Sequence, residues 1–240
     1  MTIAFRATLG GTTTDTPASG LQITTNIAAQ LGDLVLVCVA KDNSSVTAGL
    51  DTTNEVSAIA DSRGNGWKKV AEFSKGGGAA GEGVVLAIWS SILGKSMPIG
   101  TVIQITTDYV AGKVAGAIAF SLSPNYEAYT PITVASAQTN GAALASLGSG
   151  LLTGSIETLF FRAAALELGT RAAPTPTASW TTGMDYYSTT MWLFAEWSIQ
   201  TATNAASAPT AGGATTDTGS LYPSFRERLP QNVLFFGAPL

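Results

Sequence analysis

Histidine is absent from the 240-residue sequence, and cysteine occurs once, as Cys38. Without histidine there is no Ser-His or Cys-His pair to activate a nucleophile, and no metal site with a histidine ligand. A single cysteine also excludes an intrachain disulfide and a zinc site built from several thiolates. Because Cys38 lies in the apolar run Leu34–Ala40, we expect it to be a small buried side chain.

Charged residues are also scarce, at 12% of the chain, where soluble proteins usually have about a quarter. The hydrophobic content of 45% argues against a disordered chain. So little charge is nevertheless unusual for the surface of a free monomer. The net charge of −4 and the scattered basic residues give no footprint for nucleic acid. We therefore expect a folded protein whose partners are other proteins.

Long apolar runs are missing as well. The longest have about ten residues, and a membrane-spanning helix needs about 20. The segment Met1–Arg6 has no charged start followed by an apolar run, which a secretory signal peptide would show. The sequence therefore predicts no contact with a membrane and synthesis without Sec export.

Motifs for catalysis or cofactor binding are absent or stand in the wrong context. No serine precedes a lysine by three residues, so the S-x-x-K pattern of Ser-Lys enzymes is missing. Gly76–Gly81 fits G-x-G-x-x-G, but the strand-like Gly83–Ser91 follows where a dinucleotide site needs a helix. Asp51–Glu55 carries oxygen ligands without the spacing of an EF-hand. We expect no enzymatic activity, no cofactor and no metal.

Strand signals, in contrast, are frequent. Short runs of β-branched and aromatic residues alternate with clusters of Gly, Asn, Asp and Pro, and no sustained helical periodicity interrupts them. The expected strands are Leu21–Asn26, Asp33–Ala40, Glu55–Asp61, Trp67–Phe73, Gly83–Ser91, Thr101–Thr107, Val114–Leu122, Ile132–Ala137, Glu157–Leu168, Ala178–Thr182, Thr189–Gln200 and Val233–Phe236. Their even spacing predicts an all-β fold, specifically a jelly-roll-like antiparallel β-sandwich.

Some segments predict more than a strand. Asp33–Ala40 is apolar on both faces, which indicates either a central strand that is covered on both sides or an outward face that a neighbouring protein buries. Val114–Leu122 alternates large and small residues, so its large face suits a core and its flat face can meet another layer. Asp61–Gly66 predicts a tight hairpin between its flanking strands. Arg162 and Glu196 interrupt apolar strands, which predicts a cross-strand pair, two solvent-facing charges or a functional role such as a catalytic acid at Glu196.

The simplest domain organisation is one large sandwich over residues 1–222, with long loops and a C-terminal segment over residues 223–240. Two small sandwiches that meet near residues 140–154 are the alternative. The C-terminal segment is either the final strand of the domain or an arm that docks on a neighbouring protein. Its candidate interaction residues are Phe225, Arg226, Arg228, Phe235 and Phe236.

Three aromatic residues form a second candidate interaction site. Trp180, Tyr186 and Tyr187 flank a turn that contains glycine. Aromatic side chains exposed on a loop mark a binding surface, for example for a sugar. The alternative is that these rings pack between strands.

Four motifs in the first half carry a resemblance to known proteins. In chain order they are Gly32–Val37, Ala60–Trp67, Ala87–Ser91 and Val102–Thr107. This order resembles the jelly-roll and Ig-like sandwich domains of structural proteins of tailed bacteriophages. The resemblance covers Leu21 to Leu122 and continues more loosely to Gln200.

The resemblance implies a virion protein that is made in the host cytoplasm, lacks catalytic activity and self-associates, for example as a trimer. It carries over no functional residue, because the shared positions belong to turns and cores. We expect a protein that decorates the capsid shell and contacts the other virion proteins there. The alternative is a tail or fibre module that binds a receptor or a carbohydrate.

Overall fold

The structure is a computed structural model, which describes residues 3–45, 47–50, 55–79, 82–122, 129–131, 136–140, 147–148, 157–168, 172–201, 206–207, 209–212 and 215–227. Its regular elements within these ranges are all strands, and the strands pair in antiparallel fashion. This arrangement confirms the all-β class and the antiparallel β-sandwich. In the same ranges, no helix has the length and apolar character to cross a membrane.

The strands have the following bounds in chain order. They are β1 (Ala4–Thr14), β2 (Ala18–Thr24), β3 (Leu34–Asp42), β4 (Gly49–Leu50), β5 (Val56–Asp61), β6 (Lys68–Gly76), β7 (Gly83–Ile92), β8 (Val102–Val110), β9 (Lys113–Ser121), β10 (Tyr129–Pro131), β11 (Ser136–Asn140), β12 (Leu147–Gly148), β13 (Thr158–Leu168), β14 (Ala172–Thr175), β15 (Thr181–Tyr187), β16 (Met191–Gln200), β17 (Ala206–Ser207), β18 (Thr210–Gly212), β19 (Thr215–Leu221) and β20 (Ser224–Glu227).

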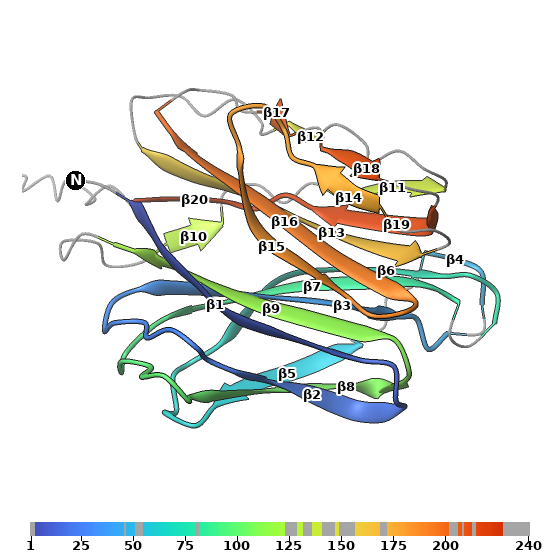
Figure 1. Cartoon of the computed structure of the whole chain (residues 1–240), viewed down its shortest axis with the longest axis horizontal. Helices are drawn as coiled ribbons and strands as arrows, with labels where there is room; N and C mark the ends of the chain where they lie inside the picture. The colour runs from blue at the N-terminus through green and yellow to red at the C-terminus, as the bar shows by residue number, and fades with distance from the viewer. Residues whose placement is uncertain are drawn as a thin grey trace, which may run out of the picture.

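Three sheets are stacked in layers (Figure 1). The central sheet has six strands in the order β1-β9-β3-β7-β6-β4. The small sheet, β2-β8-β5, covers one of its faces. The large sheet covers the other face and contains β10-β20-β13-β16-β15 together with β19 and β11. The first half of the chain thus builds the central and small sheets, and the second half builds the large sheet.

Strand β3 contributes to both cores of the stack, and all nine of its residues are buried. Leu34, Leu36, Cys38 and Ala40 pack in the first core, between the central and large sheets. Val35, Val37 and Val39 pack in the second core, between the central and small sheets. Of the two interpretations of this segment, the central strand covered on both sides is confirmed. Cys38 is buried as expected, and its burial raises the pKa of the thiol.

Strand β9 divides its residues by size in the same way. Val114, Ile118 and Phe120 belong to the first core, and Ala115, Ala117 and Ala119 belong to the second. The small face therefore does meet another layer, as the sequence indicates. Glycine is needed at Gly116, because a Cβ there would lie 2.8 Å from the Tyr186 ring and 2.9 Å from the Met184 sulfur.

The turn at Asp61–Gly66 is present, but the predicted hairpin is wrong. The Asp61 carboxylate accepts hydrogen bonds from the Arg63 backbone N–H (2.8 Å) and from the Trp67 indole N–H (2.7 Å), and these bonds close the turn. The flanking strands then enter different sheets, because β5 pairs with β8 and β6 pairs with β7. The turn residues determine only that the chain reverses direction here. Which strands β5 and β6 pair with depends on how their side chains pack in the cores of the two sheets.

The C-terminal segment begins as a strand of the large sheet. Strand β20 pairs with both β13 and β10, and the Phe225 side chain is buried in the first core. Residues 228–240 lie outside the described residues, so the expected strand Val233–Phe236 and the arm interpretation stay predictions.

The core between the central and large sheets combines side chains from both halves of the chain, for example Ile118 and Phe161.

Candidate functional site

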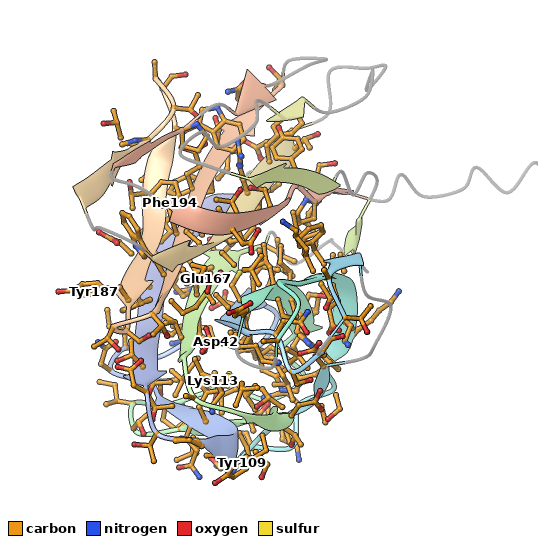
Figure 2. All side chains as sticks on the ribbon, turned by 90° about the vertical axis from the view of Figure 1, so that its right-hand side faces the viewer. Asp42, Tyr109, Lys113, Glu167, Tyr187 and Phe194 are labelled. Atoms are coloured by element: carbon orange, nitrogen blue, oxygen red, sulfur yellow. The ribbon has the colours of Figure 1, made fainter. Side chains whose placement is uncertain are left out.

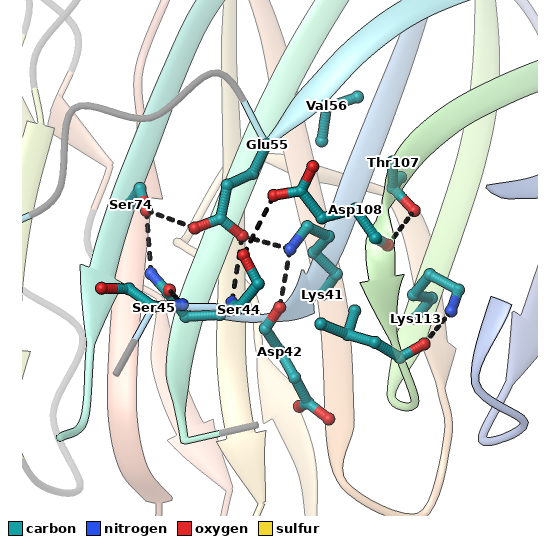
Figure 3. Close-up of polar contacts among 12 residues, drawn as sticks. Lys41, Asp42, Ser44, Ser45, Glu55, Val56, Ser74, Thr107, Asp108 and Lys113 are labelled. Carbon is teal, nitrogen blue, oxygen red and sulfur yellow. Dashed lines mark hydrogen bonds and ion pairs between the residues drawn. The ribbon is translucent and has the colours of Figure 1, made fainter. Parts of the chain in front are cut away.

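Ionisable side chains gather at one end of the sandwich, where β3 ends and β9 begins. Figure 2 faces this end, and Asp42, Lys113 and Glu167 lie there on three different strands. Figure 3 shows the polar contacts among the buried members of the group. We call this the acidic end and define it by four of its exposed or half-exposed carboxylates, which are Asp15, Glu82, Asp108 and Glu167.

An ion pair between Lys41 and Glu55 is fully buried at the acidic end, with both side chains 0% exposed. The Glu55 carboxylate also accepts hydrogen bonds from the Ser44 backbone N–H (3.2 Å) and the Ser74 hydroxyl (3.3 Å). The Lys41 ammonium donates in addition to the carbonyl of Asp42, at 2.8 Å. Since Lys41 lies on the central sheet and Glu55 immediately precedes β5 of the small sheet, the pair joins these two layers.

Lys113, at the start of β9, is buried and bonded to backbone carbonyls. Its ammonium donates to the carbonyls of Ala18 (3.0 Å), Ala111 (3.3 Å) and Val110. Desolvation lowers the pKa of Lys113, and the positive charge of Lys41 lowers it further. The contacts link β9 to the start of β2 and to the end of β8, so this lysine also holds the central and small sheets together.

Asp42 lies at the end of β3, close to the turn that joins β15 and β16 of the large sheet. One carboxylate oxygen, Oδ2, accepts a hydrogen bond from the Gly112 backbone N–H at 2.9 Å. The other, Oδ1, is buried without a hydrogen-bond partner. Burial raises the pKa of Asp42 to about 6, and the negative charge of Glu167 adds to the effect. A Cβ on Gly112 would lie 2.1 Å from the Thr190 hydroxyl, so glycine permits this close approach of the large sheet.

The raised pKa of Asp42 predicts a pH-dependent cost to stability. Folding favours the protonated carboxyl, so this cost is absent below the ordinary pKa of 3.8 and grows as pH rises to about 6. It then stays constant, at no more than about 3 kcal/mol. Asp42→Asn removes the titrating group and can keep the bond from Gly112. Relative to the unchanged protein, the variant is expected to gain stability between pH 4 and pH 7 in urea unfolding. A stability difference that is constant over this range would contradict the assignment.

The contacts at the acidic end serve to join sheets. Lys41 and Glu55 neutralise each other, and Lys113 is held by carbonyl groups. Within the part of the chain that the structure describes, no group of three or more Asp, Glu or Cys residues is arranged to hold a metal ion. The arrangement can fix the three layers relative to one another, and it can take up a proton at Asp42.

The three aromatic residues predicted as a binding site do not form one exposed platform. Trp180 is only 8% exposed, and its ring packs against Tyr222 with 5.8 Å between ring centroids. Tyr186 is half-buried over Gly116, and burial raises its pKa. Tyr187 is 45% exposed at the end of β15. Neighbouring residues of a strand point to opposite faces, so Tyr186 and Tyr187 diverge.

The predicted C-terminal interaction residues are placed only in part. Phe225 is 1% exposed and faces the first core, so it serves the fold of its own chain and is not open to a partner. Arg226 lies on β20 opposite Thr158 and Thr130. The Arg226 side chain and the residues Arg228, Phe235 and Phe236 lie outside the described part.

Arg162 and Glu196 are direct neighbours on β13 and β16, and both are fully buried. The cross-strand pairing is thus confirmed, and the solvent-facing alternative is wrong. Desolvation lowers the pKa of Arg162 to about 10, and attraction to Glu196 opposes this shift. The Glu196 carboxylate accepts hydrogen bonds from the Thr177 N–H (2.7 Å) and hydroxyl (2.6 Å), and Arg162 donates to the Ser220 hydroxyl (3.1 Å).

The sequence reasoning missed Lys41, Asp42 and Lys113. A signal was available, since Lys41 and Asp42 directly follow the apolar residues of β3 and Lys113 directly precedes those of β9. Charged residues at the ends of strands that are covered on both faces have to be bonded or bent out to water. The sequence pattern places Glu55 at the start of a strand, next to a loop, and its burial depends on Lys41, which is 14 residues away.

Comparisons of the chain with protein-family models, with curated proteins and with solved structures each found no match.

Proposed function

We propose that this chain is a non-enzymatic structural protein of a virus particle and that it decorates the capsid shell. The observation that carries the proposal is that the buried ionisable side chains are bonded to other groups inside the protein. Lys41, Glu55 and Lys113 are bonded between layers of the sandwich. Arg162 and Glu196 are likewise buried as neighbours within the large sheet. Ionisable side chains that are bonded inside the fold in this way favour a structural role over a catalytic one.

The surface supports a role in assembly. Large apolar side chains such as Ile27, Leu31 and Ile99 are exposed at the end of the sandwich opposite the acidic end. Exposed apolar groups gain about 25 cal/mol per Å² when a partner covers them. A stack of three sheets gives these groups a fixed position, as a repeated contact between the subunits of an assembly requires. The sequence resemblance to phage structural domains points to the same role.

A tail or fibre module that binds a receptor or a carbohydrate is the second candidate. The observation in its favour is the exposure of two tyrosines, Tyr109 (71%) and Tyr187 (45%). Tyrosine rings combine an apolar face with a hydroxyl group, which suits contact with sugars. The buried Trp180 does not contribute to such a surface in this structure.

Mass photometry with shells tests the two candidates. The protein is mixed with shells of the virus that encodes it, after these have been stripped of accessory proteins. Decoration predicts saturable binding at a copy number that matches the shell lattice. The absence of shell binding would overturn this proposal. Glycan-array binding that is lost in Tyr187→Ala would then support the tail or fibre module.

A further inference from the structure

The end opposite the acidic end carries a fixed group of exposed apolar side chains. Leu31 and Ile99 are each 69% exposed, and Ile27 is 46% exposed. They lie on the loops β2–β3 and β7–β8, which are bonded to each other along their length. The Thr25 N–H donates to the Thr101 carbonyl at 2.9 Å, and Ala29 and Met97 form an antiparallel bridge. This register places Ile27 across from Ile99.

The two loops are anchored in the protein. Ala29 and Met97 are buried in the second core, at 1% and 0% exposure. The Gly32 N–H donates to the Leu93 carbonyl, and the Leu93 N–H donates to the Asp33 carbonyl, both at 2.9 Å. The exposed apolar residues between these anchors are therefore held in place, and they cannot fold back into the core without breaking those bonds.

Positively charged side chains lie at the same end as the apolar group. Arg63, Lys68 and Lys95 are exposed at this end, and together with Ile27, Leu31 and Ile99 they define the basic end. The Arg63 guanidinium donates to the Ser96 carbonyl at 3.3 Å, and the Lys95 N–H donates to the Asn65 side chain at 2.8 Å. These bonds join the Asp61–Gly66 turn to the β7–β8 loop.

The nearby carboxylates of the central and small sheets are already engaged. Asp33 is buried, pairs with Arg6 and accepts a hydrogen bond from the Gln30 N–H at 2.7 Å. Asp61 closes its own turn and bonds the Trp67 indole. This part of the surface is therefore apolar and positive.

At the acidic end, in contrast, the lysine side chains are buried and carboxylates are exposed. Its lysines, Lys41, Lys75 and Lys113, are buried and bonded within the protein. The carboxylates that define this end remain exposed or half-exposed. Tyr109, with 71% exposure, directly follows Asp108 in the chain and adds an aromatic ring to the end that Figure 2 faces. Among the described residues named for each end, the exposed charges thus differ in sign, and each end presents large apolar or aromatic side chains.

We propose that the basic end of one copy docks on the acidic end of the next copy. Complementary charge orients such an encounter, and burial of Ile27, Leu31, Ile99 and Tyr109 supplies affinity. The contact is heterologous, so it generates a closed ring where the rotation between copies closes and an open filament where it does not. This inference goes beyond shell decoration, because it requires only the chain itself.

Charge reversal at each end tests the contact. Sedimentation velocity of the full chain is expected to show association that grows with protein concentration and weakens at high salt. Arg63→Glu/Lys95→Glu and Asp15→Lys/Glu82→Lys are each expected to abolish it. An equal mixture of the two variants is expected to associate again, because the reversed ends complement each other. Leu31→Asp is expected to weaken the contact by about tenfold or more.

Gln22→Lys/Gln104→Lys is the matched control, because both side chains are exposed on the small sheet and bond each other there. It is expected to leave association unchanged. Urea unfolding of every variant checks that the fold is intact. A protein that stays monomeric at low salt, or an assembly that neither reversal disturbs, would overturn the inference. Neither result bears on shell binding, which has its own measurement.

Discussion

Lys41→Met is expected to lower the free energy of unfolding by about 3–5 kcal/mol, because it leaves the charge of Glu55 buried without its partner. Glu55 is 0% exposed, and its bonds from the Ser44 N–H and the Ser74 hydroxyl come from neutral groups. Those two dipoles cannot replace a full positive charge in a dry site. Urea unfolding at pH 7 measures the loss directly.

Removal of both charges is expected to restore most of that stability. Glu55→Gln keeps an oxygen for the bonds from Ser44 and Ser74, so Lys41→Met/Glu55→Gln has no uncompensated buried charge. Lys68→Met, at an exposed position, serves as control and is expected to change stability by less than about 0.5 kcal/mol. If the single and double variants lose the same stability, the loss comes from packing around Lys41 and not from charge.

Phe161→Ala and Ile103→Ala are expected to destabilise one and the same unfolding transition. Phe161 lies in the first core and Ile103 in the second, and both are fully buried. Loss of a large core side chain costs about 3–5 kcal/mol for phenylalanine and about 2–5 kcal/mol for isoleucine. Because β3 contributes to both cores, neither core can come apart while the other keeps its full packing.

Urea unfolding followed by tryptophan fluorescence and by circular dichroism provides the measurement. Both variants are expected to shift a single transition to lower urea, with the two signals coincident. Ile99→Ala, at an exposed loop position, is the control and is expected to change stability by less than about 0.5 kcal/mol. Two separated transitions, each sensitive to one variant only, would show that the layers unfold independently.

The architecture could be predicted from the sequence where a segment carries information about both of its faces. The run Leu34–Ala40 is apolar throughout, and Val114–Leu122 separates large from small residues. Both patterns allow a central layer with neighbours on both sides, and the structure has one. For Leu34–Ala40 the sequence leaves open whether the second face is covered by the chain itself or by another protein. The strand pairing after Asp61–Gly66 could not be predicted from the turn motif, because the motif describes only the local reversal of the chain. Which strand pairs with β7 and which with β8 depends on residues far away in the sequence.

The candidate sites were harder to predict, because burial of a polar or aromatic side chain depends on distant residues. Trp180 stands beside a turn in the sequence, but it packs on Tyr222, which directly follows β19. Lys41 and Glu55 likewise meet only after the central and small sheets have stacked. The pairing of Arg162 with Glu196 was accessible, since both residues interrupt apolar strands of similar length.

The order in which the layers are encoded has a consequence for synthesis on the ribosome. Strands β1–β9 supply the central and small sheets, and the large sheet needs residues as late as Glu227. At a synthesis rate of about 5–20 residues per second, strands β1–β9 are complete roughly 5–20 s before the large sheet that covers them. During that time Ile118, Phe120 and their neighbours form an uncovered apolar face on the nascent chain. Slow or interrupted translation in the second half therefore exposes this protein to aggregation or to capture by chaperones.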